Sequence, residues 1–130
     1  MEEIWKDIEG YEGLYQVSNL GRVKSLDRKI DFKDGRYATY KGRVLSPKIK
    51  NGYKYVVVTQ NSKYRTFLVH RLVAKAFLPN PENKPCIDHI NTDRTDNRVE
   101  NLRWCTHKEN MWNIKTREKM AIQYKKRFAA

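Results

Sequence analysis

Apolar and polar residues alternate over much of residues 14–69, with the two-residue period of half-buried β-strands. Residues 14–18 and 22–26 alternate on either side of a short turn, residues 19–21, which contains Asn and Gly. Both residue types tolerate the backbone of a tight turn, so this stretch predicts a β-hairpin. Residues 27–42 are polar and basic, and they predict either a long loop or an extended hairpin.

A second group of predicted strands follows. Residues 44–49 and 53–60 flank Asn51 and Gly52, which together form the strongest short signal for a hairpin turn. Residues 64–69 complete an antiparallel meander after a polar turn. The last two of these three segments are rich in β-branched and aromatic residues, which pack well on a pleated surface.

From residue 70 the apolar period changes to that of a helix. The spacing predicts a short helix over residues 70–78, which ends before Pro79 because proline cannot continue the hydrogen-bond ladder. Two short apolar segments further on, residues 85–88 and 102–105, are expected to pair as strands. A polar stretch rich in Asp, Asn and Arg separates them.

Thr106 and Glu109 have the spacing of a capping box, which predicts the start of another helix. The fold class expected is therefore α+β, with N-terminal antiparallel β-hairpins and a meander, then a ββα unit, then a basic C-terminal helix. We divide the chain into a basic β-rich module over residues 1–69, a ββα unit over residues 70–118 and a basic helical tail over residues 119–130.

Composition narrows the class of partner. The chain has 130 residues, and 27 Lys and Arg against 15 Asp and Glu give a net charge of +12. No apolar run approaches the roughly 18 residues of a membrane span, and no apolar signal segment opens the sequence. Two cysteines cannot form a disulfide framework, so we expect a cytoplasmic protein without a membrane partner. The charge indicates a polyanionic partner, with nucleic acid first.

The positive charge is concentrated in one part of the chain. Residues 20–75 carry 15 bases and three acids, whereas residues 76–113 carry five bases and six acids. Double-stranded DNA is the expected partner, because basic β elements can dock on its phosphates. The expected contacts in the basic segment are Lys24, Arg28, Lys29, Lys33, Arg36, Lys41, Arg43, Lys48, Lys50 and Lys54.

The nearly neutral segment holds residues suited to phosphodiester hydrolysis. A neutral imidazole such as that of His89 can take a proton from water, because its pKa lies near working pH. A hard divalent cation near the leaving oxygen prefers oxygen ligands, which Asp88 and Asn110 could supply. Asn101 follows the polar loop and could help to orient the imidazole. Strand, loop and helix would have to bring these four residues together.

The stretch DHINTDRTDNRVENLRWCTHKEN strongly resembles the HNH endonucleases with a ββα-metal site, and is most like those of phages and phage introns. The preceding VHRLVAKAFLPNPENKP and the N-terminal EIWKDIEGYEGLYQVSNLGRVKSL resemble segments of the same homing-type nucleases, the second being a NUMOD-like module. The resemblance covers residues 3–113. It implies DNA cleavage in the host bacterium with one divalent metal, Mg²⁺ or Mn²⁺, and products with 5′-phosphate and 3′-hydroxyl ends. Nicking is the expectation, because one HNH site cuts one strand, and a double-strand break by a dimer or a second event stays open.

Roles carry over from this resemblance by motif position. It implies that His89 is the general base, that Asp88 and Asn110 are metal ligands, and that Asn101 holds the loop that follows His89 together with its imidazole. At least one of Arg94, Arg98 and Arg103 is expected to steady a phosphate. The resemblance also implies no structural zinc, because the zinc variant of the family uses two Cys-x-x-Cys pairs. We expect a monomer or a weak dimer.

Three alternatives stay open at this point. The chain could retain the fold as a DNA-binding or regulatory protein that does not cut, or it could bind RNA. A zinc site built from Cys86, Cys105 and His107 is the third. Asn113 lies one helical turn after Asn110 and could replace it as a ligand.

Overall fold

The structure is a computed structural model, and it describes residues 2–110. Short strands form small sheets that pack around one α-helix of the described residues. This helix, α1, spans Val69–Phe77. The strands and one short 3₁₀ helix, in chain order, are β1 (Trp5–Asp7), β2 (Tyr15–Ser18), β3 (Val23–Ser25), β4 (Arg28–Asp31), β5 (Tyr37–Tyr40), β6 (Lys48–Lys50), β7 (Tyr53–Gln60), β8 (Lys63–Leu68), β9 (Cys86–His89), η1 (Val99–Asn101) and β10 (Leu102–Cys105).

The first sheet has the order β1-β2-β3 and contains the predicted hairpin over residues 14–26. Gly21 closes its turn with a φ of 85°, a left-handed conformation that favours glycine. Strand β1 was not foreseen from the sequence. The side chain of Asn19 stabilises it, because its Oδ1 accepts a hydrogen bond from the backbone N of Ile4 at 2.7 Å.

The predicted meander is present as β6-β7-β8. The turn of Asn51 and Gly52 has positive φ at both residues, 55° and 82°, which is the backbone that the sequence signal implies. The strand predicted over residues 44–49 is wrong in its first half, because β6 begins only after Pro47. Proline has no N–H for a ladder, and Val44 instead forms an isolated bridge with Lys24.

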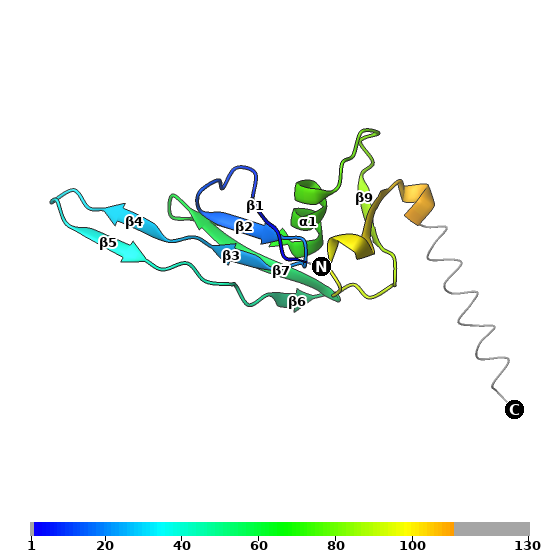
Figure 1. Ribbon diagram of the computed structural model, residues 1–130, viewed down its shortest axis with the longest axis horizontal. Coiled ribbons are helices and arrows are strands. Elements are labelled where there is room, and N and C mark those ends of the chain that lie inside the picture. The colour runs from blue at the N-terminus through cyan, green and yellow to red at the C-terminus, as the bar shows by residue number, and fades with distance from the viewer. Residues whose placement is uncertain (1, 111–130) are drawn as a thin grey trace, which may run out of the picture.

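The predicted extended hairpin also forms, as β4 and β5. These two strands pair only with each other, from Arg28 opposite Tyr40 to Asp31 opposite Tyr37. Figure 1 shows them reaching away from the rest of the molecule, at the end opposite β9.

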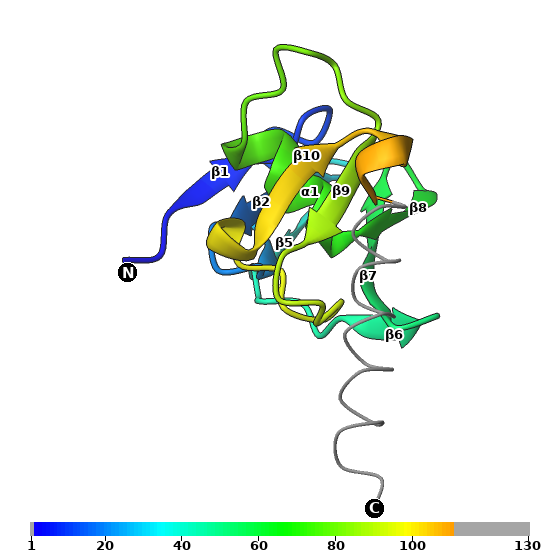
Figure 2. The ribbon, with the colours of Figure 1, turned by 90° about the vertical axis from the view of Figure 1, so that its right-hand side faces the viewer.

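One hydrophobic core joins the N-terminal strands to the later elements. Helix α1 packs against strands of both halves, and Figures 1 and 2 both place it beside β9. The buried residues of this core are Ile8, Tyr11, Tyr15, Val17, Val23, Val56, Val58, Val69, Leu72, Val73 and Leu102. Because strands from the first sheet and from the β9–β10 hairpin share this core, their relative positions are fixed by packing.

The expected α+β class is therefore confirmed. No helix of residues 2–110 is both long and apolar enough to cross a membrane. The predicted helix beyond residue 110 and the basic tail lie outside the described residues. The division at residues 69 and 118 stays a prediction.

Candidate active site

Asp88 and His89 are the last two residues of β9 and lie opposite Arg103 and Leu102 of β10. Both side chains are buried, with exposed fractions of 3% and 5%. Successive side chains of a strand point to opposite faces, so these two neighbours in sequence have different surroundings. The Asp88 carboxylate lies beside the guanidinium of Arg103, and the His89 imidazole lies beside the rings of His70 and Tyr53.

His89 is held through Nε2, which donates a hydrogen bond to Oδ1 of Asn97 at 2.9 Å. An amide oxygen only accepts hydrogen bonds, so this contact places the proton on Nε2 and the lone pair on Nδ1. Asn97 is itself buried, with 4% exposed. The sequence analysis did not single out Asn97, because an Asn in a polar loop usually indicates a turn.

Two aromatic side chains border the His89 ring. The imidazole of His70, from α1, lies edge-on with its centroid 5.1 Å away. The ring of Tyr53, at the start of β7, lies 5.2 Å from His70 and 6.1 Å from His89. Residues from the N-terminal meander and from the helix therefore help to define the position of this imidazole.

His70 is a buried neutral imidazole. Burial is the main cause that lowers its pKa to about 4, and the positive charges of His89 and Arg71 lower it further. Within the described residues its Nδ1 has no hydrogen-bond partner, and the same is true of Nδ2 of Asn97. His70 is buried in this position, with an exposed fraction of 6%.

The carboxylate of Asp88 forms an ion pair with Arg103. Its Oδ2 accepts a hydrogen bond from Nε at 3.1 Å and lies 3.0 Å from a terminal guanidinium nitrogen. A buried carboxylate requires such compensation, because the charge is costly away from water. The Arg103 side chain is half exposed, so its guanidinium spans from the buried carboxylate to the surface.

Asn101 organises the loop between β9 and β10. Its Oδ1 accepts a hydrogen bond from the backbone N of Asn91 at 2.9 Å, and its Nδ2 donates to the backbone O of Asp96 at 2.8 Å. Its own carbonyl accepts from the N of Ile90 at 2.8 Å. These contacts fit the expected role in holding the loop, whereas the hydrogen bond described for the imidazole comes from Asn97.

Two aspartates further stabilise the loop. Asp93 accepts hydrogen bonds from the N and the hydroxyl of Thr95, at 3.0 and 2.7 Å. Asp96 is paired with Arg98, and this contact lowers the pKa of the Asp96 carboxyl to about 2. Arg98 also pairs with Glu100 at 2.8 Å, so its charge is compensated within the loop.

Asn110 lies in the helical turn that follows β10. The capping box expected from the sequence is present: the N of Glu109 donates to Oγ1 of Thr106 at 3.1 Å, and the N of Thr106 donates to the Glu109 carboxylate at 3.2 Å. This capping fixes the first turn, and the backbone N of Asn110 bonds to the carbonyl of Thr106 at 3.0 Å. Asn113 lies outside the described residues.

The donors available to a metal here are oxygens. No group of three or more His, Cys, Asp and Glu within residues 2–110 is placed to hold an ion. Asp88 and Asn110 offer one carboxylate and one amide oxygen, a donor set that suits a hard divalent cation with waters and phosphate in its remaining positions. In this structure the Asp88 carboxylate is paired with the Arg103 guanidinium.

The cysteines lie on the same hairpin. Cys86 and Cys105 are register partners, and Cys105 is buried, which raises the pKa of its thiol to about 11. Cys86 Sγ lies 3.1 Å from Nδ1 of His107, so this histidine contacts a thiol and not the His89 cluster.

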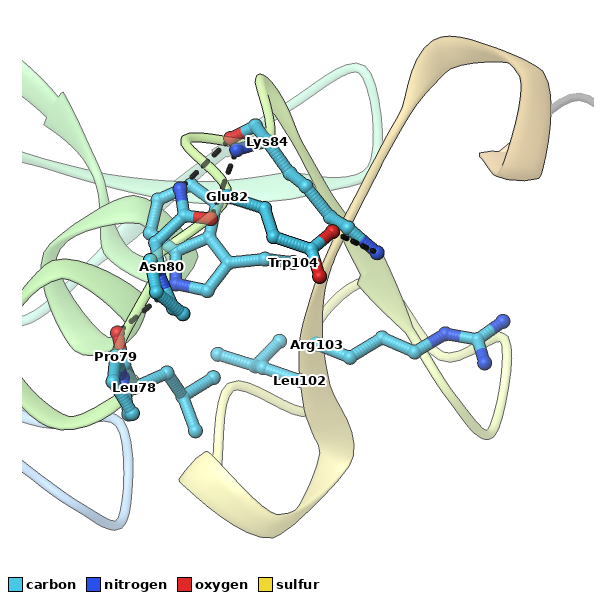
Figure 3. Close-up of a pocket in the computed structure, with 9 residues that line it drawn as sticks. Leu78, Pro79, Asn80, Glu82, Lys84, Leu102, Arg103 and Trp104 are labelled. Carbon is cyan, nitrogen blue, oxygen red and sulfur yellow. Dashed lines mark hydrogen bonds and ion pairs between the residues drawn. The ribbon is translucent and has the colours of Figure 1, made fainter.

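A pocket of about 300 Å³ lies beside β10. It is lined by residues 78–82, 84 and 102–104. Figure 3 shows the side chain of Arg103 extending away from Leu78 and Leu102. Trp104 closes the pocket, since its Nε1 donates to the carbonyl of Leu78 at 3.0 Å. The pocket is lined by none of the four predicted site residues, Asp88, His89, Asn101 and Asn110. We interpret it as a gap in the packing between β10 and the loop that follows α1.

The bases expected to contact DNA lie mainly on β4 and β6 and in the segments before and after β5, and Figure 1 shows these three strands along one side of the molecule. Lys54, on β7, and Lys24, on β3, are half-buried, and Nζ of Lys24 lies 4.3 Å from the ring centroid of Trp5. The β6–β7 turn meets the loop of the site at Arg94, which lies 5.1 Å above the Tyr53 ring and contacts the carbonyl of Asn51. The basic strands are therefore continuous with the candidate site.

Comparisons with known proteins agree with this arrangement. The NUMOD4 motif matches residues 3–59, and an HNH endonuclease family model matches residues 67–112. A solved structure concerning DNA binding and cleavage by the HNH homing endonuclease I-HmuI superposes with a TM-score of 0.71 and 38% identity, over 97% of this chain and 67% of that one. The chain therefore belongs to the HNH endonuclease family, in the group that carries a NUMOD4 motif.

Individual relatives are similar in sequence. DNA endonuclease I-HmuI of Bacillus phage SP01 is 40% identical over 114 residues, which are 87% of this chain and 58% of the phage protein. An HNH endonuclease of Acanthamoeba polyphaga mimivirus is 41% identical over 68% of this chain and 28% of its own length. The chain thus spans little more than half of the first relative and less than a third of the second.

Proposed function

We propose that this chain is a phage-type HNH homing endonuclease that hydrolyses one strand of duplex DNA. The observation that carries the proposal is the hydrogen bond from His89 Nε2 to Asn97, in a hairpin that also carries a buried Asp88. With the proton on Nε2, Nδ1 is the basic nitrogen of the ring, and a basic imidazole nitrogen is what activation of water requires. Family membership supports the reaction class.

In this mechanism His89 takes the proton of a water molecule at Nδ1 as the water oxygen forms its bond to phosphorus. Asn97 accepts the hydrogen bond from Nε2 and so selects the tautomer that presents Nδ1 before the transfer, and the same contact stabilises the imidazolium that forms. Asn101 maintains the loop that positions Asn97. The bond from phosphorus to the 3′-oxygen then breaks, so the products carry a 5′-phosphate and a 3′-hydroxyl.

Asp88 and Asn110 would hold one divalent cation, Mg²⁺ or Mn²⁺. When bound, such an ion neutralises charge that develops on the phosphate and on the leaving oxygen. Arg103 shares the Asp88 carboxylate through Oδ2 and reaches the surface, so we assign it the phosphate contact among the three arginines of the hairpin and its loop. Arg98 is already engaged by two acids.

Plasmid cleavage tests the proposal. Supercoiled plasmid incubated with the protein and Mg²⁺ or Mn²⁺ should become nicked, and EDTA should prevent this. His89→Ala should lower the nicking rate by about 100- to 10,000-fold, because a general base contributes that much. His107→Ala is the matched control, since this exposed histidine contacts Cys86. A protein that binds DNA but never nicks it would instead be a non-cleaving DNA-binding protein.

The metal assignment has a separate test that needs no catalysis. Calorimetric titration with Ca²⁺ or Mn²⁺ should show weaker binding for Asp88→Ala and Asn110→Ala than for the wild type. Asp93→Ala is the control, because its carboxylate bonds to Thr95 within the loop. Titration curves that match the wild type would exclude Asp88 and Asn110 as ligands.

A further inference from the structure

The β4–β5 hairpin is a two-stranded ribbon that projects from the body of the molecule. Its two strands pair with each other in a separate sheet, and Figure 1 shows it extending beyond β2 and β3 at the end opposite β9. Within the ribbon strands every side chain is exposed except those of Arg28 and Ala38, which are half-buried. An isolated two-stranded ribbon has marginal stability in water, so the conformation of this ribbon must be stabilised by contacts with the rest of the protein or with a partner.

The root of the ribbon is firmly attached to the first sheet. The N of Gly42 donates to Oδ1 of Asp27 at 2.6 Å, and the N of Ser25 donates to the carbonyl of Arg43 at 2.8 Å. A Cβ on Gly42 would lie only 2.3 Å from the carbonyl oxygen of Ser25, so the two chain segments approach as closely as glycine permits. The direction of the ribbon is therefore set by the rigid body of the protein.

Large apolar side chains are exposed along the ribbon. Tyr37 and Tyr40 have exposed fractions of 62% and 50%, Phe32 of 49% and Ile30 of 39%. Two bases lie close to these rings: Nζ of Lys29 is 4.4 Å from the Tyr37 centroid, and the guanidinium of Arg28 is 6.0 Å from that of Tyr40. Rings and cations together form a surface that suits a partner with both apolar edges and negative charge.

The charge of the ribbon is also available to a partner. Residues 28–41 carry five bases and two acids, and each acid is paired with a neighbouring base. Asp31 lies 3.6 Å from Lys29, and Asp34 accepts a hydrogen bond from Arg36 at 2.6 Å. Among residues 2–110 the ion pairs do not include the remaining three bases, which are Arg28, Lys33 and Lys41.

We propose that the β4–β5 ribbon inserts into the major groove of duplex DNA beside the segment that is cut. This inference rests on the proposed function and adds a second contact region to it. The major groove of B-DNA admits a two-stranded β-ribbon, whereas that of A-form RNA is too narrow. Arg28, Lys33 and Lys41 contact phosphates, and the exposed rings contact base edges and thymine methyl groups.

The position of the ribbon makes its contribution separable from catalysis. It lies at the opposite end of the molecule from β9, and the basic strand β6 lies between them along the same side (Figure 1). A duplex that follows this side passes from the site to the ribbon. The ribbon therefore extends the length of DNA that is recognised and does not contact the reacting phosphate.

Binding measurements on DNA of two lengths test the proposal. The variant Arg28→Ala/Lys33→Ala/Lys41→Ala removes three ribbon bases, and Lys63→Ala/Arg65→Ala/Lys75→Ala removes three exposed bases of β8 and α1 as the charge-matched control. Affinity is measured in Ca²⁺ over a range of salt concentrations. Each lost phosphate contact lowers the salt slope by about 0.9, so the ribbon variant should lose about 2 to 3 on a long duplex.

Three further results complete the test. The ribbon variant should lose hydroxyl-radical protection on one side of the cleavage position, and Tyr37→Ser should weaken long-duplex binding at constant salt slope. A short duplex that covers only the cut segment should be bound equally by the ribbon variant and the wild type. Equal slopes and footprints for the two triple variants would overturn the inference, as would equal binding of duplex RNA. Wild-type protein that never cuts would refute the proposed function, while the footprints still report on the ribbon.

Discussion

At the scale of residues, His89 depends on partners from three separate parts of the chain. Asn97 belongs to its own loop, His70 to α1 and Tyr53 to β7. The Asn97 amide oxygen accepts a hydrogen bond from Nε2 of the imidazole, and this contact favours the tautomer with its proton on Nε2. The rings restrict the plane of the imidazole by packing. Orientation and protonation are thus set by different neighbours.

Removal of the Asn97 amide should therefore impair cleavage more than folding. Asn97→Ala leaves the Nε2 proton without its acceptor, and we expect the single-turnover nicking rate to fall by about 10- to 100-fold. Asn97→Asp retains an acceptor oxygen and should keep more activity than Asn97→Ala. DNA affinity in Ca²⁺ should match the wild type for both. Equal nicking rates for wild type and Asn97→Ala would show that the amide does not position the base.

His70 should make folding sensitive to acid. In the unfolded chain this histidine binds a proton below pH 6.5, whereas in the folded protein its pKa is about 4. The unfolded state therefore holds more protons between these values, and the free energy of unfolding falls as the pH drops from 6.5 towards 4. The loss between pH 7 and pH 5 from this group is about 2 kcal/mol.

Urea unfolding at the two pH values measures this effect. His70→Phe keeps a ring beside His89 and removes the titrating group, so its unfolding free energy should fall less between pH 7 and pH 5. If the wild type and His70→Phe lose equal stability over this range, His70 is not the group that responds.

At the scale of elements, the N-terminal hairpin supports the loop of the site directly. The carbonyl of Asn19 accepts a hydrogen bond from the N of Val99 at 2.9 Å. A Cβ added to Gly21 would lie 2.9 Å from both Cβ and the carbonyl oxygen of Asn97. The turn of the β2–β3 hairpin thus lies against Asn97, which hydrogen-bonds to the imidazole of His89, and the NUMOD4-matched and HNH-matched segments are in contact there.

Gly21→Ala should consequently reduce stability and nicking together. The substitution places a side chain at positive φ and against Asn97, and the strain at φ alone costs about 1 to 3 kcal/mol. Gly13→Ala is the matched control, because Gly13 has a φ of 79° and nothing within 4 Å of an added Cβ. Thermal unfolding and nicking are measured for both. A nicking rate for Gly21→Ala no lower than for Gly13→Ala would contradict the coupling.

Elements defined by local signals could be predicted from the sequence. The turn of Asn51 and Gly52, the capping box of Thr106 and the paired strand over residues 102–105 all form as expected. Strand β1 could not be predicted, because it depends on the side chain of Asn19 from a distant turn. The same reason applies in the site: the contacts of His89 with Asn97, His70 and Tyr53 arise from tertiary packing, which no local pattern encodes.

At the scale of the whole molecule, positive charge and candidate chemistry occupy different regions that share one core. The bases lie on β4 and β6 and in the segments before and after β5, and Asp88 and His89 lie at the end of β9. From the net charge of +12, a polyanionic partner could be predicted from the sequence alone. The position of β4, β5 and β6 along one side of the molecule, in the direction of the β9–β10 hairpin, is a property of the tertiary structure (Figure 1).

From this arrangement we expect an affinity for DNA that depends on salt and a chemistry that depends on one hairpin. One site of this kind addresses one phosphate at a time, so a single copy should break one strand. The central claim is that His89 activates water for hydrolysis with departure of the 3′-oxygen. The chemistry of the DNA ends reports on that claim directly.

Sequencing and enzymatic analysis of the ends made from a phage-genome or random DNA substrate is the most direct measurement. The account predicts breaks in one strand that carry a 5′-phosphate and a 3′-hydroxyl and can be resealed by DNA ligase. The same treatment with His89→Ala should yield no such ends above background. Ends that carry a 3′-phosphate, or ligatable ends made equally by His89→Ala, would contradict it.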